Sequence, residues 1–315
     1  MLKTSFSLKS IIILMTKVAL LSGGKSNERE ISLKSGSSVK VALKEAGYEV
    51  ISLDPINDPA TYLDDFKNCD VVFPVLHGKY GEDGVIQKFL AENNIKFVGS
   101  GSVASDLCFD KYKYYLFLKN RNILMPETYL VNKDEYLKLK LKSYPHVVKP
   151  NDGGSSIDTF IIREPGSFNF DQALNAFNKY SQMLVQSLIE GIELTVAIVG
   201  EESLPVIEII PPKDKEFDYE NKYNGETSEL CPPKNISLGL QKKAQELALE
   251  VHKLVNCRHI SRSDFILTKD NKLYLLETNT IPGLTNQSLV PKAAFQVGMT
   301  MPILCKKLVE FALKS

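Results

Sequence analysis

Short apolar runs alternate with segments of helical spacing over the first hundred residues, and this order limits the fold more than any other feature. Apolar runs of strand length occupy residues 18–21, 48–53, 70–76 and 97–99. Segments with apolar residues at helical spacing occupy residues 28–46 and 85–93. Strands that alternate with helices pair in parallel, and the helices cover the faces of the sheet. This part of the chain therefore predicts a parallel α/β sheet.

Two glycine turns follow predicted strands, at Gly23-Gly24 and at His77-Gly78. Ligands of parallel sheets bind at the carboxyl ends of strands, so both turns are candidate binding positions. The segment from Ala19 to Ser26 is one glycine short of a P-loop, because Ala19 stands where the first glycine belongs. Ala19 lies inside a predicted strand and cannot turn to wrap phosphates. We therefore reject a P-loop, and no G-x-G-x-x-G follows the strand to favour a dinucleotide site.

Length and charge exclude several classes of protein. A chain of 315 residues fits two or three small domains, and its 38 basic and 38 acidic residues cancel. A balanced chain gives no reason to expect nucleic-acid or membrane-surface binding. The five scattered cysteines include no C-x-x-C pair, which favours a reducing cytoplasm over a disulfide framework. No run approaches the ~18 apolar residues of a membrane span.

The chain divides into three predicted domains after a short extension. Residues 1–15 carry only a brief apolar run, so we expect a dispensable extension, with Met15 as an alternative start to Met1. From Asp106 onward, helices rich in Lys and Tyr precede predicted antiparallel strands. The expected domains are an N-terminal α/β substrate domain, a central α+β domain and a C-terminal α+β domain, at residues 16–99, 100–185 and 186–315.

The strongest chemical signal is a predicted β-hairpin at residues 262–279. A two-residue turn at Asp270-Asn271 would place Asp264 opposite Glu277 and Arg262 opposite Asn279. These four side chains would then share one face, which Ile266 and Leu275 would continue toward the turn. Two carboxylates and an amide oxygen on a rigid face suit Mg²⁺. The alternative is an exposed salt-bridge patch with Arg262, although opposed carboxylates are unfavourable without a cation.

A glycine-rich segment is the candidate phosphate cradle. The strand at residues 146–149 ends at Pro150, and Gly153-Gly154-Ser155-Ser156 precedes a second strand that ends at Ile162. Backbone N–H groups and hydroxyls at such a tip can fold over phosphates, and Lys149 supplies a positive charge. Alone, a hairpin of this kind is more often an ordinary turn. Its combination with a magnesium hairpin favours the phosphate role.

Together these motifs resemble the ATP-grasp ligases, and within them the D-alanine–D-alanine ligase family. The resemblance runs in family order from residue 17 to the C-terminus. Its motifs are L-S-G-G-K-S-N-E-R-E-I-S-L at 21–33, H-G-K-Y-G-E-D-G at 77–84, V-K-P with G-S-S at 148–156, Y-E-N-K-Y at 219–223, E-T-N-T-I-P-G-L-T at 277–285 and S-L-V-P-K at 288–292. The second and the last two motifs are highly specific.

The resemblance implies a three-domain ATP-grasp fold in which the two α+β domains enclose ATP. The nucleotide would be held by Lys111, Lys149, Ser156, Gln186, Glu193 and Lys222, with Glu193 at the ribose. Two Mg²⁺ ions, for which Mn²⁺ can substitute, would be held by Asp264, Glu277 and Asn279. A loop from about residue 212 to 229 would close over the site and keep water from the intermediate.

The resemblance also implies roles at the substrates. Glu28 would bind the ammonium group of the first D-alanine, and Arg262 with the Gly283 backbone would stabilise the oxyanion. The carboxylate of the second D-alanine would be held by Ser288 and Leu289, and His77 would also bind substrate. Glu28 would form a hydrogen-bonded clasp across three domains with Ser155 and Tyr223.

The implied reaction is the ATP-dependent synthesis of D-alanyl-D-alanine through D-alanyl phosphate, for peptidoglycan, by a cytoplasmic homodimer. A D-alanine–D-lactate ligase or another D-amino-acid or dipeptide ligase is the alternative. A catalytically inactive nucleotide-binding regulator is disfavoured by the intact metal and oxyanion set. Three positions depart from the family pattern: Asp158 replaces a usual Gly, Gln186 replaces a usual Glu at the adenine, and Ser261-Arg262-Ser263 replaces Gly/Ala-Arg-x. The Gln186 amide must flip to accept from the adenine amine.

Overall fold

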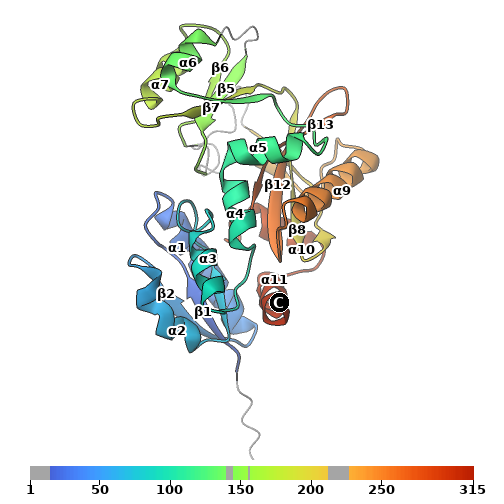
Figure 1. The fold of residues 1–315 in the computed structure, drawn as a ribbon. Helices are drawn as coiled ribbons and strands as arrows, with labels where there is room; N and C mark the ends of the chain where they lie inside the picture. Colours follow the sequence, from blue (N-terminus) through green and yellow to red (C-terminus); the bar gives the residue numbers. More distant parts are fainter. Residues whose placement is uncertain (1–14, 140–144, 155–156, 212–226) are drawn as a thin grey trace, which may run out of the picture.

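The computed structural model describes residues 15–139, 145–154, 157–211 and 227–315, and the first part of it is the expected parallel sheet (Figure 1). Its strand order is β2-β1-β3. The strands and the helices around them are β1 (Lys17–Leu21), α1 (Arg29–Glu45), β2 (Glu49–Leu53), η1 (Pro59–Tyr62), α2 (Leu63–Lys67), β3 (Val71–Pro74) and α3 (Val85–Glu92). Both pairings of β1 are parallel, which confirms the prediction. The strand predicted at 97–99 is wrong, because only Phe97 makes an isolated bridge, to Val72.

The two faces of this sheet bury different cores. One face packs on α3 through residues such as Ala19, Val72 and Ile86. The other face carries Val18 and Phe73 into a core that also contains the last helix and part of the last sheet, including Leu308. Consecutive side chains in a strand point to opposite faces, so each strand contributes to both cores. The N-terminal sheet is thereby joined to the C-terminal end of the chain.

The central part of the chain forms an antiparallel sheet of order β4-β7-β5-β6. Its elements are β4 (Thr128–Val131), α6 (Lys133–Lys138), β5 (His146–Pro150), β6 (Phe160–Ile162), α7 (Phe168–Ala176) and β7 (Met183–Ser187). Tyr136, Val148 and Phe177 belong to a separate core between the sheet and its two helices. Asn132 begins α6 with a capping box to Glu135, which satisfies backbone donors at the helix start.

The last part is built on a six-stranded sheet of order β11-β10-β8-β12-β13, with β9 paired to β8. Its elements are β8 (Ile192–Val199), β9 (Glu202–Ser203), β10 (Ile207–Ile210), β11 (Ser228–Leu230), α9 (Leu238–Leu254), β12 (Ile260–Leu267), β13 (Leu273–Asn279), α10 (Leu289–Gln296) and α11 (Met301–Lys314). Two helices that precede the central sheet, α4 (Ser102–Phe109) and α5 (Lys111–Lys119), share the core of this last sheet with α9. Figure 1 shows them between the N-terminal and central parts, beside β12. The domain limits at residues 99 and 185 stay a prediction.

The predicted hairpin is present, but its turn and the face of Leu275 differ from the prediction. Leu275 is buried with Phe265 in the core beneath α9, and not on the face of Asp264 and Ile266. Arg262 pairs with Asn279 and Asp264 with Glu277, as predicted. Beyond Asp264 the register shifts by one, so Phe265 and not Ile266 faces Leu275. The loop holds three residues between Thr268 and Lys272 rather than two, and Leu276 is the extra residue of a bulge. The longer loop and the bulge compensate, which leaves the pairs at the open end in place.

Within the described part of the chain, no helix has the length and apolar character that crossing a bilayer requires.

Candidate active site

A cleft of about 610 Å³ lies between the central and last sheets, within the size range of small-molecule sites. Most of the predicted nucleotide and metal residues line it. They are Lys111 from the start of α5, Lys149 from β5, Gln186 from β7, Glu193 from β8, Asp264 from β12 and Glu277 from β13. Glu28 and Lys79 of the N-terminal part reach the same cleft, together with Asp152, Gly153 and Gly154. Residues from all three parts of the chain therefore meet at one cavity.

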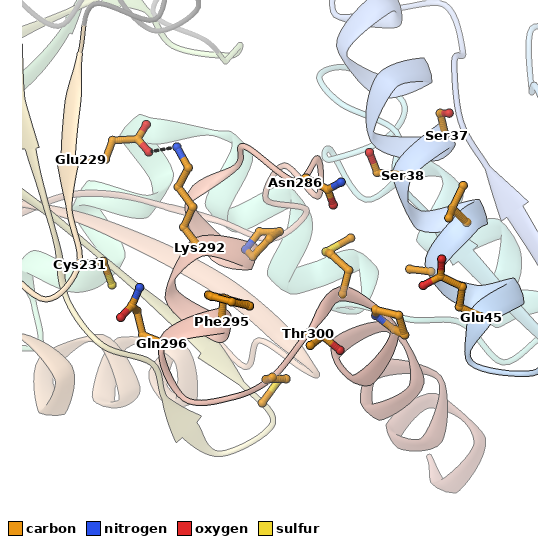
Figure 2. Close-up of a pocket in the computed structure, with 16 residues that line it drawn as sticks. Ser37, Ser38, Glu45, Glu229, Cys231, Asn286, Lys292, Phe295, Gln296 and Thr300 are labelled. Atoms are coloured by element: carbon orange, nitrogen blue, oxygen red, sulfur yellow. Dashed lines mark hydrogen bonds and ion pairs between the residues drawn. The ribbon is translucent and has the colours of Figure 1, made fainter.

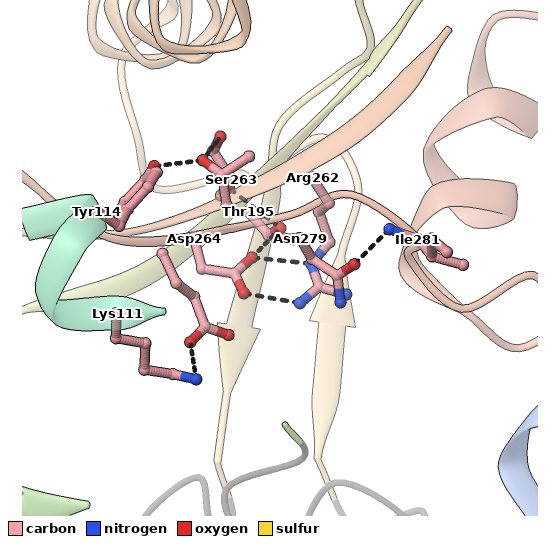
Figure 3. Close-up of polar contacts among 10 residues, drawn as sticks. Lys111, Tyr114, Thr195, Arg262, Ser263, Asp264, Asn279 and Ile281 are labelled. Carbon is pink, nitrogen blue, oxygen red and sulfur yellow. Dashed lines mark hydrogen bonds and ion pairs between the residues drawn. The ribbon is translucent and has the colours of Figure 1, made fainter. Parts of the chain in front are cut away.

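The open end of the hairpin carries a compact charged cluster (Figure 3). Arg262 donates to both carboxylate oxygens of Asp264, from Nε at 2.9 Å and Nη2 at 2.8 Å. Thr195 on the neighbouring strand donates from Oγ1 to Asp264 Oδ1 at 2.6 Å. Lys111 Nζ lies 4.0 Å from Glu277 Oε2. Burial opposes the charged form of Arg262, but the Asp264 carboxylate outweighs it and raises the pKa of Arg262 above its usual value.

The oxygen donors of this cluster suit a hard divalent cation. Asp264 and Glu277 face each other across the hairpin, and Asn279 lies beyond them at its open end, where its Oδ1 accepts from the Ile281 backbone N–H at 2.8 Å. Two carboxylates and one amide leave the remaining ligand positions of Mg²⁺ to water or phosphate oxygen. The described residues include no group of three or more His, Cys, Asp or Glu in metal-binding proximity.

The glycine hairpin after β5 contacts both other parts of the molecule. Lys111 Nζ donates to the Gly153 carbonyl oxygen, and Lys79 Nζ lies 2.7 Å from Asp152 Oδ2. A Cβ added at Gly154 would lie only 2.7 Å from Glu28 Oε1, so glycine permits this close approach. The predicted cradle is thus placed directly against Glu28. Ser155 and Ser156 lie outside the described residues, as do Lys222 and Tyr223 of the predicted closing loop.

The segments that follow β1 and β3 contact each other. Ser26 donates from Oγ to the His77 carbonyl oxygen at 2.6 Å, and the Gly78 N–H donates to Glu82 Oε2 at 2.6 Å. Glu82 is 7% exposed, and burial followed by the nearby Glu28 carboxylate raises its pKa to about 8. Burial lowers the pKa of His77 to about 4, so its imidazole is neutral near pH 7. The Ser35 hydroxyl lies 3.2 Å from His77 Nε2 and fixes the ring.

Three of the predicted oxyanion and acceptor residues lie together at the start of α10, outside the lining of the nucleotide cleft: Gly283, Ser288 and Leu289. Arg262 lies in β12, and His77 follows β3. A Cβ at Gly283 would lie 2.9 Å from Ser288 Oγ, which shows how closely these residues approach. Ser288 is the N-cap of α10, and its Oγ accepts from the Thr285 N–H at 3.1 Å. Leu289 is the first residue of the helix. Helix N-termini attract anions, so this position suits a substrate carboxylate.

Family models match most of the chain. The model described as D-ala D-ala ligase C-terminus matches residues 111–310, and that described as D-ala D-ala ligase N-terminus matches residues 56–100. A D-alanine–D-alanine ligase of Zymomonas mobilis is 41% identical over 305 residues, which cover 94% of each chain. One of Clostridium botulinum is 36% identical, over 95% of this chain and 99% of the relative. This chain belongs to the D-alanine–D-alanine ligase family.

Solved structures of the family agree with the fold. A Bacillus anthracis D-alanine–D-alanine ligase superposes with a TM-score of 0.82 at 29% identity, covering 95% of this chain and 98% of that one. The same enzyme complexed with ATP gives a TM-score of 0.80 at 28% identity, covering 95% and 97%. The VanG D-Ala:D-Ser ligase of Enterococcus faecalis gives 0.79 at 26% identity, covering 95% and 99%. The ATP-grasp architecture of this ATP-dependent ligase family is therefore shown for the chain.

The structure accommodates two departures from the pattern of the D-alanine–D-alanine ligase family. Asp158 has φ of 55°, a conformation that favours Gly and that Asp tolerates. Its carboxylate accepts from Lys179 Nζ and from the Tyr180 hydroxyl, each at 2.6 Å, so its charge is paired. Ser261 and Ser263 are both fully buried, with Oγ atoms 2.7 Å from His252 Nδ1 and from Thr278 Oγ1 respectively. These two serines therefore hold the strand behind the site.

A second hollow of about 680 Å³ lies away from the nucleotide cleft, between α1 and the helices α10 and α11 (Figure 2). Apolar side chains such as Val41 and Phe295 form part of its wall. Lys292 Nζ lies 2.6 Å from Glu229 Oε2 at one side of the hollow. None of the residues predicted for the active site lines this second hollow.

Sequence reasoning missed two residues that hold the site. Thr195 binds Asp264, and it lies two residues after Glu193 on β8, hence on the same face of that strand. That spacing was the available signal. Asp152 binds Lys79 across the cleft, and nothing in the sequence indicates that contact.

Proposed function

We propose that this protein is a D-alanine–D-alanine ligase that uses ATP to form D-alanyl-D-alanine through D-alanyl phosphate. The single observation that carries the proposal is the convergence on one cleft of Glu28, the glycine hairpin and the Asp264–Glu277 pair. These residues come from the N-terminal, central and last parts of the chain, and the fold brings them together. The D-alanine–D-alanine ligases that it resembles over more than nine tenths of its length support the choice of substrate.

The residues suggest how such a reaction would be assisted. Lys111 and Lys149 line the cleft and would bind the phosphates of ATP. Ser156 and Lys222, which lie outside the described residues, would be further contacts. Gln186 and Glu193 would bind the adenine and the ribose. Asp264, Glu277 and Asn279 would hold two Mg²⁺ ions, or Mn²⁺, which neutralise phosphate charge when bound.

Both substrates would be positioned at the N-terminal side of this cleft. The carboxylate of the first D-alanine attacks the γ-phosphate of ATP, the bond to the β,γ-bridging oxygen breaks and ADP leaves, while Glu28 holds the ammonium group of D-alanine. The amine of the second D-alanine then attacks the acyl-phosphate carbon, and inorganic phosphate leaves. Arg262 stays charged because of Asp264 and, with the Gly283 backbone, would stabilise the oxyanion of that step. No protein nucleophile is needed, so positioning supplies most of the rate.

The second substrate would bind between His77 and the N-terminus of α10. Ser288 and Leu289 would bind its carboxylate, and the neutral His77 would lie beside it. The VanG D-Ala:D-Ser ligase, whose name gives D-serine as a substrate, has a similar fold. The identity of the acceptor therefore needs a direct test. A D-lactate or other D-amino-acid acceptor is the alternative product class.

One assay decides between these products. The enzyme is incubated with ATP, Mg²⁺ and D-alanine alone, or with D-serine, D-lactate or L-alanine added, and ADP, phosphate and products are quantified. We expect D-alanine alone to give one dipeptide per ADP. If phosphate is released only when D-lactate or D-serine is present, that compound is the acceptor in place of D-alanine. If no phosphate is released with any substrate, the proposal that the protein is a ligase is wrong.

The cellular setting follows from the same proposal. D-Alanyl-D-alanine would serve peptidoglycan precursor synthesis in the cytoplasm, and the five free cysteine thiols are compatible with a reducing compartment. A homodimer is proposed on the family resemblance alone. Sedimentation of the purified protein, with and without ATP, tests that part independently of activity.

A further inference from the structure

The Gln186 side chain belongs to a chain of hydrogen bonds that begins at a backbone carbonyl and ends at the nucleotide cleft. Gln186 in β7 is 5% exposed and lines the cleft, and its cross-strand neighbour Thr128 in β4 is 3% exposed. Thr128 Oγ1 lies 2.9 Å from the Pro126 carbonyl oxygen and 2.8 Å from Gln186 Nε2. Both bonds are shielded from water, so neither can be exchanged for a bond to solvent without cost.

Counting protons along this chain fixes the orientation of the amide. A threonine hydroxyl has one proton to donate, and the Pro126 carbonyl can only accept. The Thr128 oxygen must therefore accept from its other neighbour, and Nε2 is the only end of the Gln186 amide that can donate. If the amide were flipped, Gln186 Oε1 would face Thr128 Oγ1. Either no proton would lie between these two oxygens, or the Thr128 hydroxyl would donate to Oε1 and leave the Pro126 carbonyl without its donor. Each alternative leaves a buried polar group unsatisfied.

We propose that Thr128 is a specificity-determining residue, which turns Gln186 Oε1 toward the cleft as an acceptor and thereby selects a purine with a 6-amino group. This inference rests on the proposed use of ATP. The 6-amino group of adenine can donate to Oε1. The 6-oxo group of hypoxanthine or guanine can only accept, so it would oppose Oε1 and leave it unsatisfied.

A Gln at position 186 needs a hydrogen-bond partner that orients it, whereas the Glu that is usual there in the family does not. A carboxylate presents two acceptor oxygens, so either orientation offers an acceptor to the nucleotide. An amide has one acceptor end and one donor end, and an unfixed amide could present either. Thr128 removes that ambiguity. Gln186 and the Thr128 hydroxyl on the neighbouring strand thus present an acceptor to the base together.

Nucleotide binding without D-alanine tests this directly. Dissociation constants for ATP, for inosine triphosphate and for the triphosphate of unsubstituted purine riboside are measured by calorimetry. We expect wild type to bind ATP at least about tenfold more tightly than inosine triphosphate, with the unsubstituted purine between them. Wild-type protein that binds inosine triphosphate as tightly as ATP would show that Nε2 faces the base, and this result needs no variant.

Variants then assign the effect to Thr128. Thr128→Val keeps the shape and removes the hydroxyl, and we expect it to reduce the ATP-to-inosine preference at least about threefold. Thr128→Ser keeps the hydroxyl and should retain the preference. In a Gln186→Glu background, Thr128→Val should leave the preference unchanged, because both carboxylate oxygens accept. Melting temperatures identify variants that do not fold.

The outcomes separate this inference from the proposed function. An unchanged preference in Thr128→Val, a lost preference in Thr128→Ser, or an equal effect in the Gln186→Glu background overturns the role of Thr128. Dipeptide formation by wild type with ATP is a separate measurement. If wild type forms the dipeptide but the preference does not depend on Thr128, only the inference fails.

Discussion

Lys79 Nζ lies 2.7 Å from Asp152 Oδ2, and this ion pair joins the turn after β3 to the glycine hairpin of the central sheet. The side chains are 69% and 40% exposed, so solvent and salt screen their attraction. Exposed pairs of this kind contribute about 0.2–1 kcal/mol. The pair therefore favours the contact between the two parts of the molecule without fixing it.

The first prediction is that Lys79→Met has a small and salt-dependent effect. We expect kcat/KM to fall no more than about fivefold at about 0.01 M salt, and the difference from wild type to vanish near 1 M. Lys88→Met is the matched control, because Lys88 pairs with Glu92 on the exposed side of α3. A loss of about a hundredfold or more would mean that Lys79 contacts a substrate rather than Asp152.

The second prediction concerns the close approach of Gly154 to Glu28. A methyl group at Gly154 would lie 2.7 Å from Glu28 Oε1, the end of a flexible side chain. The fold can accept Gly154→Ala by moving the Glu28 carboxylate, so the melting temperature should change little. The displaced carboxylate should lower kcat/KM for D-alanine by about 10- to 100-fold.

The control for Gly154→Ala is Gly101→Ala, because a Cβ at Gly101 would meet nothing within 4 Å. Melting curves and D-alanine kinetics are compared for both variants. Wild-type kinetics in folded Gly154→Ala protein would contradict the role of Glu28 at the first substrate. A fall in the melting temperature with unchanged kinetics would assign the contact to stability alone.

The hairpin shows how far sequence patterns reach. Period-two alternation and the Asp270-Asn271 turn signal placed Asp264 opposite Glu277, and the structure agrees. A two-residue turn of the predicted type needs positive φ at both positions, but among the described residues of this turn only Asn271, at 60°, has it. The chain therefore forms a longer loop. The bulge at Leu276 restores the register, and its position depends on tertiary packing that no local pattern records.

Contacts between distant segments could not be predicted from the sequence either, because they also depend on tertiary packing. The pairing of β4 with β7 places Thr128 beside Gln186, although 58 residues separate them. Likewise α11 completes the core beneath the N-terminal sheet, where helical spacing alone would suggest only a terminal helix. Periodicity identifies which face of an element is buried. It does not identify the element that covers it.

The third prediction follows from the histidines, all four of which are buried. Burial lowers the pKa of His77, His146, His252 and His259 from 6.5 to about 4. These four imidazoles bind protons near pH 6.5 in the unfolded chain and only near pH 4 in the folded chain. Glu82, whose pKa is raised to about 8, holds one more proton in the folded chain and offsets one histidine. Below about pH 6.5 the unfolded state still holds more protons, so the free energy of unfolding falls as pH is lowered.

Urea unfolding at several pH values between about 6.5 and 5 measures this slope. We expect His252→Gln to reduce the slope relative to wild type, whatever its effect on stability at neutral pH. Ser37→Ala, an exposed change on α1, serves as the control and should keep the wild-type slope. A free energy of unfolding that does not vary over this range would show that the histidines are protonated in the folded protein.

The fourth prediction concerns Tyr223, which lies outside the described residues. If Tyr223 joins Glu28 and Ser155 in the proposed clasp, Tyr223→Phe removes one hydrogen bond and no ring volume. Water should then reach the acyl-phosphate, so ATP hydrolysis continues while dipeptide formed per ADP falls. Both products are quantified in one reaction. A ratio that stays at one with an unchanged rate would exclude Tyr223 from the clasp.

The last prediction tests the hairpin as the metal site. Glu277→Gln keeps the side-chain size and removes a charge that faces Asp264 across the hairpin. Because loss of a metal ligand costs several kcal/mol of transition-state stabilisation, turnover should fall about 100-fold or more while the melting temperature is retained. Mn²⁺ binding in the presence of an ATP analogue, followed by electron paramagnetic resonance, should weaken in parallel. Glu193→Gln is the contrasting variant, since a ribose contact should raise KM for ATP and leave Mn²⁺ affinity for the hairpin intact. If Glu277→Gln releases phosphate at the wild-type rate, the divalent cation is held elsewhere and Asp264 serves mainly as the partner of Arg262.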